Sequence, residues 1–231
     1  MRSAAIVIVA LCAGSTSAGF IEMRQVGVGL GQMVKLNLSG SLSEVFAGEI
    51  THEFRNGTGD AAQYSGRTLQ TYCTEITQGV TSNWAGYQCT DIDSAPVPGP
   101  AIGAAKADAI LAMLTLLMGE TAAGRLDAPT AAGFQIALWE VVYDFDAMMG
   151  RSSLDVAAGA LMVTHTDGSA LSGTVVTKSS MFMDAITGGF DPSMSIAFVS
   201  QSFQDQIVPT PGAAALLAPG AIALLRRRRL S

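Results

Sequence analysis

The sequence predicts an α+β domain: an antiparallel, β-rich sandwich or barrel with an inserted helical block. The first part of the chain alternates apolar residues with small or polar ones, as strands with one buried face do. Between residues 104 and 143 the apolar residues recur at helical spacing, and strand-like segments return towards the C-terminal end. With 49% hydrophobic and 14% charged residues, the 231-residue chain can bury the core of one such domain.

The expected strands lie mostly before the helical block. Asn56-Gly57-Thr58-Gly59 predicts a hairpin turn among them, because Asn and Gly accept positive φ. A loop rich in Pro, Ser and Asp is expected over residues 91–100. The segments with strand-like alternation are residues 25–30, 33–38, 45–54 and 69–76.

Two helices make up the expected block. The first covers residues 104–118, and Gly119 is expected to end it. The second begins at Asp127, which can cap a helix whose first turn contains Pro129, and it runs to about Tyr143. The elements expected after it are a strand over residues 169–178, a short helix over 179–186 and a closing strand over 193–203.

The N-terminal residues 1–18 show the three parts of a secretory signal peptide. Arg2 precedes an apolar run over residues 4–13, and small residues close the segment at Ala18. We therefore expect cleavage after Ala18 and export across the inner membrane. The mature domain would then comprise residues 19–207.

The last segment, residues 208–231, combines a proline motif, an apolar run and a basic cluster. Pro209-Thr210-Pro211 marks the expected end of the domain, and the apolar run over 212–225 is short for a permanent membrane anchor. The basic cluster consists of Arg226, Arg227, Arg228 and Arg229.

This order resembles the PEP-CTERM sorting signal of Gram-negative bacteria, with Thr210 in place of the usual Glu. The resemblance implies transient membrane insertion through an apolar transmembrane helix, and processing by an exosortase-type enzyme. A weak membrane anchor is the alternative.

The charge distribution excludes one class of partner. Five of the 13 basic residues are Arg2 and the four C-terminal arginines, so the stretch between them has 8 basic against 19 acidic residues, a net charge of −11. Nucleic-acid binding needs a basic face, so we expect none. Three cysteines and two histidines form no metal-ligand pattern, and no metal or cofactor is expected.

Two residues do not fit their surroundings. Gln135 lies in a helix that is otherwise apolar nearly all round, where an unpaired carboxamide costs about 1–3 kcal/mol. A hydrogen bond to the backbone would satisfy it; chemical modification of the side chain is the other explanation. Cys73 belongs to an exported chain, where cysteines usually pair, so a disulfide with Cys89 is the ordinary interpretation.

Together, the two motifs resemble the bacterial Cys-Gln thioester domains of surface adhesins. An aromatic-Cys-x-acidic strand motif matches Tyr72-Cys73-Thr74-Glu75. A later helix motif, apolar-Gln-x-Ala-apolar-Trp, matches residues 134–139, and the resemblance extends over about residues 65–144.

The resemblance implies that the thiol of Cys73 and the side chain of Gln135 form an internal thioester. Tyr72, Phe134 and Trp139 would shield it from water while packing in the core. Glu75 and Glu140 are candidates for proton transfer, although exposed, solvated carboxylates are the interpretation that we favour.

The function implied is a single covalent coupling, without turnover, so the protein is not expected to be an enzyme. The partner would be a surface protein or polysaccharide that offers an amine or a hydroxyl, at the cell surface or in the extracellular matrix. The alternative is a non-reactive matrix or envelope protein stapled by a Cys73–Cys89 disulfide.

A hydrolase has little support. The sequence contains no Gly-x-Ser-x-Gly motif, and His52 and His165 lie outside both motifs, so we expect a catalytic role for neither. Asp144 and Asp146 are close in sequence, but their position after a helix is equally typical of a solvated helix end.

Overall fold

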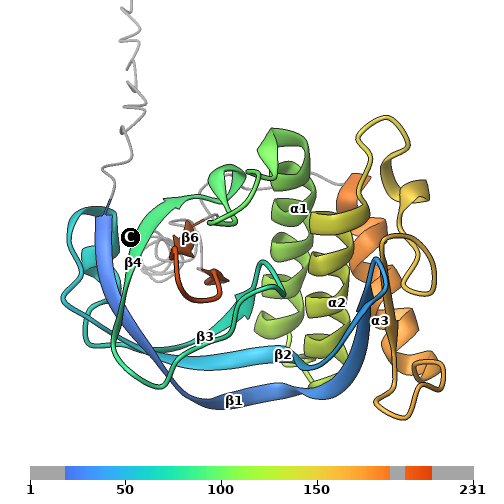
Figure 1. Ribbon diagram of the computed structural model, residues 1–231, viewed down its shortest axis with the longest axis horizontal. Helices are drawn as coiled ribbons and strands as arrows, with labels where there is room; N and C mark the ends of the chain where they lie inside the picture. The colour runs from blue at the N-terminus through green and yellow to red at the C-terminus, as the bar shows by residue number, and fades with distance from the viewer. Residues whose placement is uncertain (1–18, 188–195, 210–231) are drawn as a thin grey trace, which may run out of the picture.

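The computed structural model describes residues 19–187 and 196–209. It confirms the predicted α+β class: seven antiparallel strands form one sheet, and the helices pack beside it (Figure 1). The expected signal peptide, Pro211 and the four C-terminal arginines lie outside the described residues. Val208 is buried with the core, so packing continues one residue beyond the expected end of the domain at Ile207.

Six of the strands close into a ring, which is the barrel version of the predicted fold. The sheet order is β2-β3-β7-β6-β4-β1-β5, and β1 also pairs with β2, so only β5 stands outside the ring. The strands are β1 (Gly19–Leu38), β2 (Ser41–Arg55), β3 (Thr68–Cys73), β4 (Ala85–Asp91), β5 (Leu161–Thr164), β6 (Ile196–Val199) and β7 (Gln206–Ile207).

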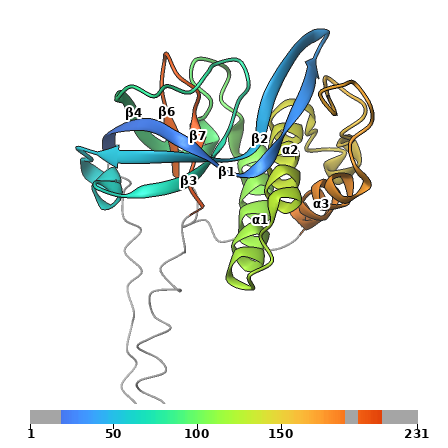
Figure 2. The same cartoon turned by 90° about the horizontal axis from the view of Figure 1, so that it is seen from below.

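The long hairpin of β1 and β2 joins the ring to the helices (Figures 1 and 2). It turns at Ser39 and Gly40, both with positive φ. Midway, at a shift in register, Gly31 and Gly48 approach so closely that a Cβ on Gly48 would lie 2.3 Å from the Leu30 carbonyl oxygen. The open end of the hairpin, on one side of these glycines, belongs to the ring. The turn end on the other side, called the far half below, pairs with β5 and packs against the helices.

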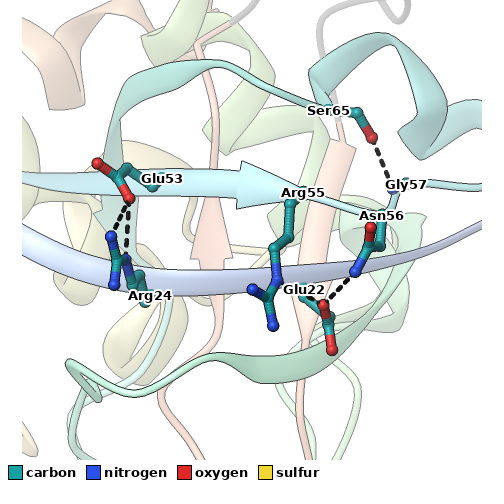
Figure 3. A network of polar contacts seen from close by, with 7 residues as sticks. All are labelled: Glu22, Arg24, Glu53, Arg55, Asn56, Gly57 and Ser65. Carbon is teal, nitrogen blue, oxygen red and sulfur yellow. Dashed lines mark hydrogen bonds and ion pairs between the residues drawn. The ribbon is translucent and has the colours of Figure 1, made fainter.

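Alternating charges cover the solvent face of this hairpin near the ring (Figure 3). Arg24 pairs with Glu53 at 2.7 Å, and Arg55 pairs with Glu22 at 2.7 Å, each across the two strands. Both guanidinium groups also lie over the ring of Trp84. The network fixes the register on the face that has no apolar core.

Three α-helices lie side by side next to the ring (Figure 1). They are α1 (Gly103–Ala122), α2 (Ala128–Asp144) and α3 (Gly173–Asp184), and α2 packs against both β1 and β2. None of the helices among the described residues is long and apolar enough to cross a membrane.

The buried residues form two clusters. The helix-side core lies between the three helices, the far half of the hairpin and the end of β3. The ring core fills the strand ring with apolar and aromatic side chains, and it includes Cys89. Cys73 packs in the helix-side core, although its cross-strand neighbours on β7 and β6 point into the interior of the ring.

The local predictions were confirmed at some elements and wrong at others. The second helix begins as expected, since Asp127 accepts a hydrogen bond from the Thr130 amide (2.8 Å). The first helix continues through Gly119 to Ala122, because a single glycine costs a helix only about 1 kcal/mol. Gly124, with φ +67°, follows its actual end.

One further prediction was wrong. The strand expected over residues 169–178 is largely α3, whose first turn is capped by the Ser172 side chain. The expected chain reversal after Asn56 does join the antiparallel strands β2 and β3, and Asn56 has a positive φ of 55°, but the connection is longer than a tight turn and contains a 3₁₀-helix (Gly59–Tyr64). The strand β4 has no counterpart among the predictions, because its glycine-containing sequence alternates only weakly.

Candidate functional site

The side chain of Gln135 is bound to the backbone of Cys73. The Cys73 amide donates to Gln135 Oε1 (2.9 Å), and Gln135 Nε2 donates to the Cys73 carbonyl oxygen (2.8 Å). Gln135 is 0% exposed and Cys73 is 3% exposed. The structure therefore brings together the two residues that the motifs singled out, although 62 positions separate them.

These two bonds complete a strand ladder. The edge of β3 pairs with β2 only as far as Thr71, and the carboxamide then makes the donor and acceptor bonds that a neighbouring residue in a strand would make. The backbone satisfies Gln135, as the ordinary interpretation of a buried glutamine requires. The same contact also holds the acyl carbon of Gln135 beside the residue that carries the thiol.

Two features of the first turns of helix α2 define its start and its packing against α3. Asp127 caps the helix. Gly133 lets α3 approach, because a Cβ at that position would lie 2.6 Å from the Cβ of Lys178. Since α2 also packs on β1 and β2, the carboxamide projects from a rigid element towards the end of β3.

Two further glutamines contact the sulfur of Cys73. The thiol donates to Gln204 Oε1 (2.9 Å), and Gln206 Nε2 donates to Sγ (3.5 Å). Gln204 also donates from Nε2 to the Glu75 carbonyl oxygen (2.6 Å), so the β6–β7 connection lies directly over the sulfur. Nothing in the sequence pointed to either residue, since they lie about 130 positions from Cys73 and just beyond the closing strand expected over residues 193–203.

Burial governs the acidity of this thiol. It raises the pKa of Cys73 to about 12, against the smaller lowering effect of the Gln206 hydrogen bond. At neutral pH the thiolate fraction is then on the order of 10⁻⁵. The buried surroundings of the sulfur therefore favour its uncharged forms, either a thiol or a thioester.

The expected shielding residues all lie in the helix-side core. The rings of Tyr72 and Phe134 pack edge to face with centroids 4.6 Å apart, and Phe182 packs on the other side of Phe134 at 5.2 Å. Trp139 is buried one turn beyond Gln135 on the same side of α2. The placement fits both roles expected for these residues, core packing and exclusion of water.

The two glutamates are not exposed, so the interpretation that we favoured for them was wrong. One oxygen of Glu75 accepts from the Gln78 amide (3.0 Å) and from Thr77, which folds the chain back after β3. Glu140 is 0% exposed, and neither oxygen has a partner of ordinary geometry in the described part of the chain. Burial raises the pKa of Glu140 to about 8, and the nearby Asp155 amide offsets only part of that effect.

The Cys73–Cys89 disulfide considered in the alternative is not formed, and both thiols are free. Along one cross-strand row, Cys73 faces Gln206, Gln206 faces Phe198, and Phe198 faces Cys89. Three interstrand steps of about 4.8 Å, even around a closed ring, leave the two Cα atoms on the order of 10 Å apart. A disulfide needs about 4.4–6.8 Å, so this register excludes it.

The remaining titratable residues of interest fall into two groups. His165 lies in the turn after β5. Asp144 accepts hydrogen bonds from two backbone amides at the start of β5, and Asp146 accepts one from the Met148 amide just after α2. His52, by contrast, is buried on β2, and its Nδ1 lies 2.9 Å from Thr71 Oγ1. His52 is therefore nearer to the candidate site than the sequence indicated.

No protein family, curated protein or solved structure matches this chain. The site is therefore interpreted from its own geometry.

Proposed function

We propose that Cys73 and Gln135 form an internal thioester, and that this exported protein uses it to couple covalently, once, to a surface partner. The observation that carries the proposal is the pair of hydrogen bonds between the Gln135 carboxamide and the Cys73 backbone. They hold the acyl carbon of Gln135 beside the backbone of the residue that carries the sulfur.

The geometry suits the reaction. The sulfur attacks the side-chain carbonyl carbon of Gln135; the S–C bond forms as the C–N bond breaks, and ammonia leaves with the thiol proton. The Cys73 amide already donates to Oε1, where negative charge develops in the tetrahedral intermediate. A backbone donor of this kind is fixed in place before the reaction.

The low thiolate fraction is compatible with this proposal. Well-oriented intramolecular groups reach effective molarities of about 10⁵–10⁸ M, which can offset a thiolate fraction of about 10⁻⁵. The product is uncharged, so the burial that disfavours the thiolate does not disfavour the thioester.

The coupling step then returns the sulfur. A nitrogen or oxygen of the partner attacks the acyl carbon, the C–S bond breaks, and Cys73 regains a proton as a thiol. The partner class is an amine or a hydroxyl on a surface protein or a polysaccharide. Because Cys73 is almost fully buried beneath the β6–β7 connection, the attacking group must be slender, such as a lysine side chain.

Export and sorting complete the proposal. The signal peptide would direct the protein across the inner membrane. An exosortase-type enzyme would then recognise and cut the PEP-CTERM-like tail, from the proline motif at Pro209 to the basic cluster that ends at Arg229. The mature protein would act at the cell surface or in the extracellular matrix.

Intact mass tests the proposal. The mature chain, purified from its native secretion route, should be lighter by one ammonia than the mass calculated from its sequence. One molecule of methylamine should then add to each chain that has lost ammonia. A chain of full mass with two titratable thiols would refute the thioester and leave a non-reactive matrix protein.

A further inference from the structure

A chain of buried polar groups leads away from the Cys73 sulfur through Gln206. Gln206 Nε2 lies 3.5 Å from Sγ, and Gln206 Oε1 lies 2.7 Å from Thr71 Oγ1. Thr71 Oγ1 in turn lies 2.9 Å from His52 Nδ1. All of these residues are buried, with Gln206 and Thr71 at 0% exposed.

Gln206 Oε1 also lies near the sulfur, at 3.8 Å against 3.5 Å for Nε2, and two further contacts fix the orientation of the amide. Nε2 also donates to the Gln204 carbonyl oxygen (3.2 Å), while Oε1 accepts from the Thr71 hydroxyl. Turning the amide over would place its oxygen against the Gln204 carbonyl oxygen. The N–H group is therefore held towards Sγ.

The Thr71 hydroxyl has one proton and three possible acceptors nearby. Gln206 Oε1 and the Ile50 carbonyl oxygen can only accept from Thr71, whereas His52 Nδ1 can donate or accept. The tautomer with a proton on Nδ1 donates it to Thr71 Oγ1 and leaves the Thr71 proton for one of the two oxygens, so we assign this tautomer to His52. Burial lowers the pKa of His52 to about 4, which keeps the ring neutral, with Nε2 as its unprotonated nitrogen.

We propose that Gln206 is a catalytic residue, whose N–H group stabilises negative charge on the Cys73 sulfur, and that Thr71 and His52 are positioning residues that hold it there. The chemical purpose rests on the proposed thioester. Sulfur carries charge when it attacks Gln135 and again when it leaves during coupling. One donor therefore serves both steps.

The main experiment compares two rates in the mature chain. Formation is followed by intact mass as ammonia is lost after refolding, and opening is followed as methylamine adds. In Gln206→Met, which keeps the length but not the donor, both rates should fall by about 10- to 100-fold. A residue that only packed would behave differently, because loosening the site slows formation but speeds opening by water or amine.

Thr71 supplies the matched pair of variants. Thr71→Val removes the hydroxyl at nearly constant shape, and both rates should fall in the same direction as in Gln206→Met. Thr71→Ser keeps the hydroxyl and should restore both rates to within a few-fold. If Gln206→Met does not fold, this pair still decides the question.

A second readout does not depend on the thioester. In Gln135→Ala, where Cys73 stays a thiol, the S–H stretching band reports the hydrogen bonds of the sulfur, and Cys89→Ala identifies which band belongs to Cys73. Adding Gln206→Met or Thr71→Val should move the Cys73 band, and adding Thr71→Ser should not. An unmoved band, or formation and opening rates that change in opposite directions, would overturn the role of Gln206. A moved band in a protein that never loses ammonia would keep the sulfur donor and refute only the proposed function.

Discussion

Cys73 and Cys89 are both buried on neighbouring parts of one sheet, but they have very different neighbours. Burial raises the pKa of both thiols, to about 12 for Cys73 and about 11 for Cys89. Acidity therefore does not distinguish them. Cys89 belongs to the apolar ring core and faces Phe198, whereas Cys73 is surrounded by the carboxamides of three glutamines.

The thiolate fraction of a buried thiol therefore does not indicate whether that thiol is reactive. What distinguishes Cys73 is an acyl carbon held beside it, together with donors for the charges that would develop. Cys89 has the same burial without these groups, so the chain contains its own control.

The largest expected difference between the two cysteines is the complete loss of thioester chemistry in one case and no loss in the other. Cys73→Ala and Gln135→Ala should each abolish the loss of ammonia and the uptake of methylamine, because each removes one partner of the bond. Cys89→Ala should leave both intact. Intact mass before and after amine treatment measures this, and equal loss in all three variants would mean that the comparison between the cysteines is wrong.

The next difference concerns the shield. Phe134→Leu should speed hydrolysis of the thioester by about tenfold, because water gains access beside Tyr72, and it should lower the free energy of unfolding by about 1–3 kcal/mol. Phe54→Leu, in the ring core, should cost a similar amount of stability without changing hydrolysis. Release of free thiol over time and urea unfolding separate the two effects.

The helix that carries Gln135 should also lose stability as the pH rises through the neutral range. The folded pKa of Glu140 is raised to about 8, so the folded state binds more protons than the unfolded state between the two pKa values. Stability should therefore fall as the pH rises from about 4.5 through 8, by up to about 5 kcal/mol from this group. Glu140→Gln should remove that fall.

Urea unfolding at pH 5, 7 and 9 measures the pH effect. Glu120 on α1 is the matched control, because its ion pair with Arg125 lowers its pKa and gives the opposite sign. Glu120→Gln should leave the decrease in the free energy of unfolding between pH 5 and 9 unchanged. A decrease of equal size in Glu140→Gln and in the parent chain would contradict the assignment to Glu140.

The smallest expected effect lies on the outer face of the ring. Arg24 and Glu53 form a partly exposed ion pair, and a double-mutant cycle with Arg24→Ala and Glu53→Ala should give a coupling of about 0.2–1 kcal/mol. The yield of thioester should not change. A large change in yield would show that the ring and the Cys73 site are coupled more strongly than their separate cores indicate.

Parts of the fold and of the site could be predicted from local patterns. The second helix follows from its apolar residues and the Asp127 cap, and the strand that ends at Cys73 follows from its alternation. The same patterns misplaced Glu140, because a single carboxylate in an apolar helix gives no sign that it stays buried. They also missed Gln204 and Gln206, which follow the predicted closing strand in a segment with no pattern of its own.

By itself, the sequence determined that α2 is buried and contains one carboxamide, and that Cys73 lies in a strand. Only the tertiary structure decided that this strand ends at Cys73, where the Gln135 amide completes the ladder. It also decided that Gln204 and Gln206 contact the sulfur, and that Thr71 and His52 continue the polar chain beyond Gln206. The physical reason is the separation along the chain over which each interaction acts. Helical and strand periodicity act over a few residues, whereas contacts across 62 or 133 positions depend on how the ring closes and where α2 packs on it.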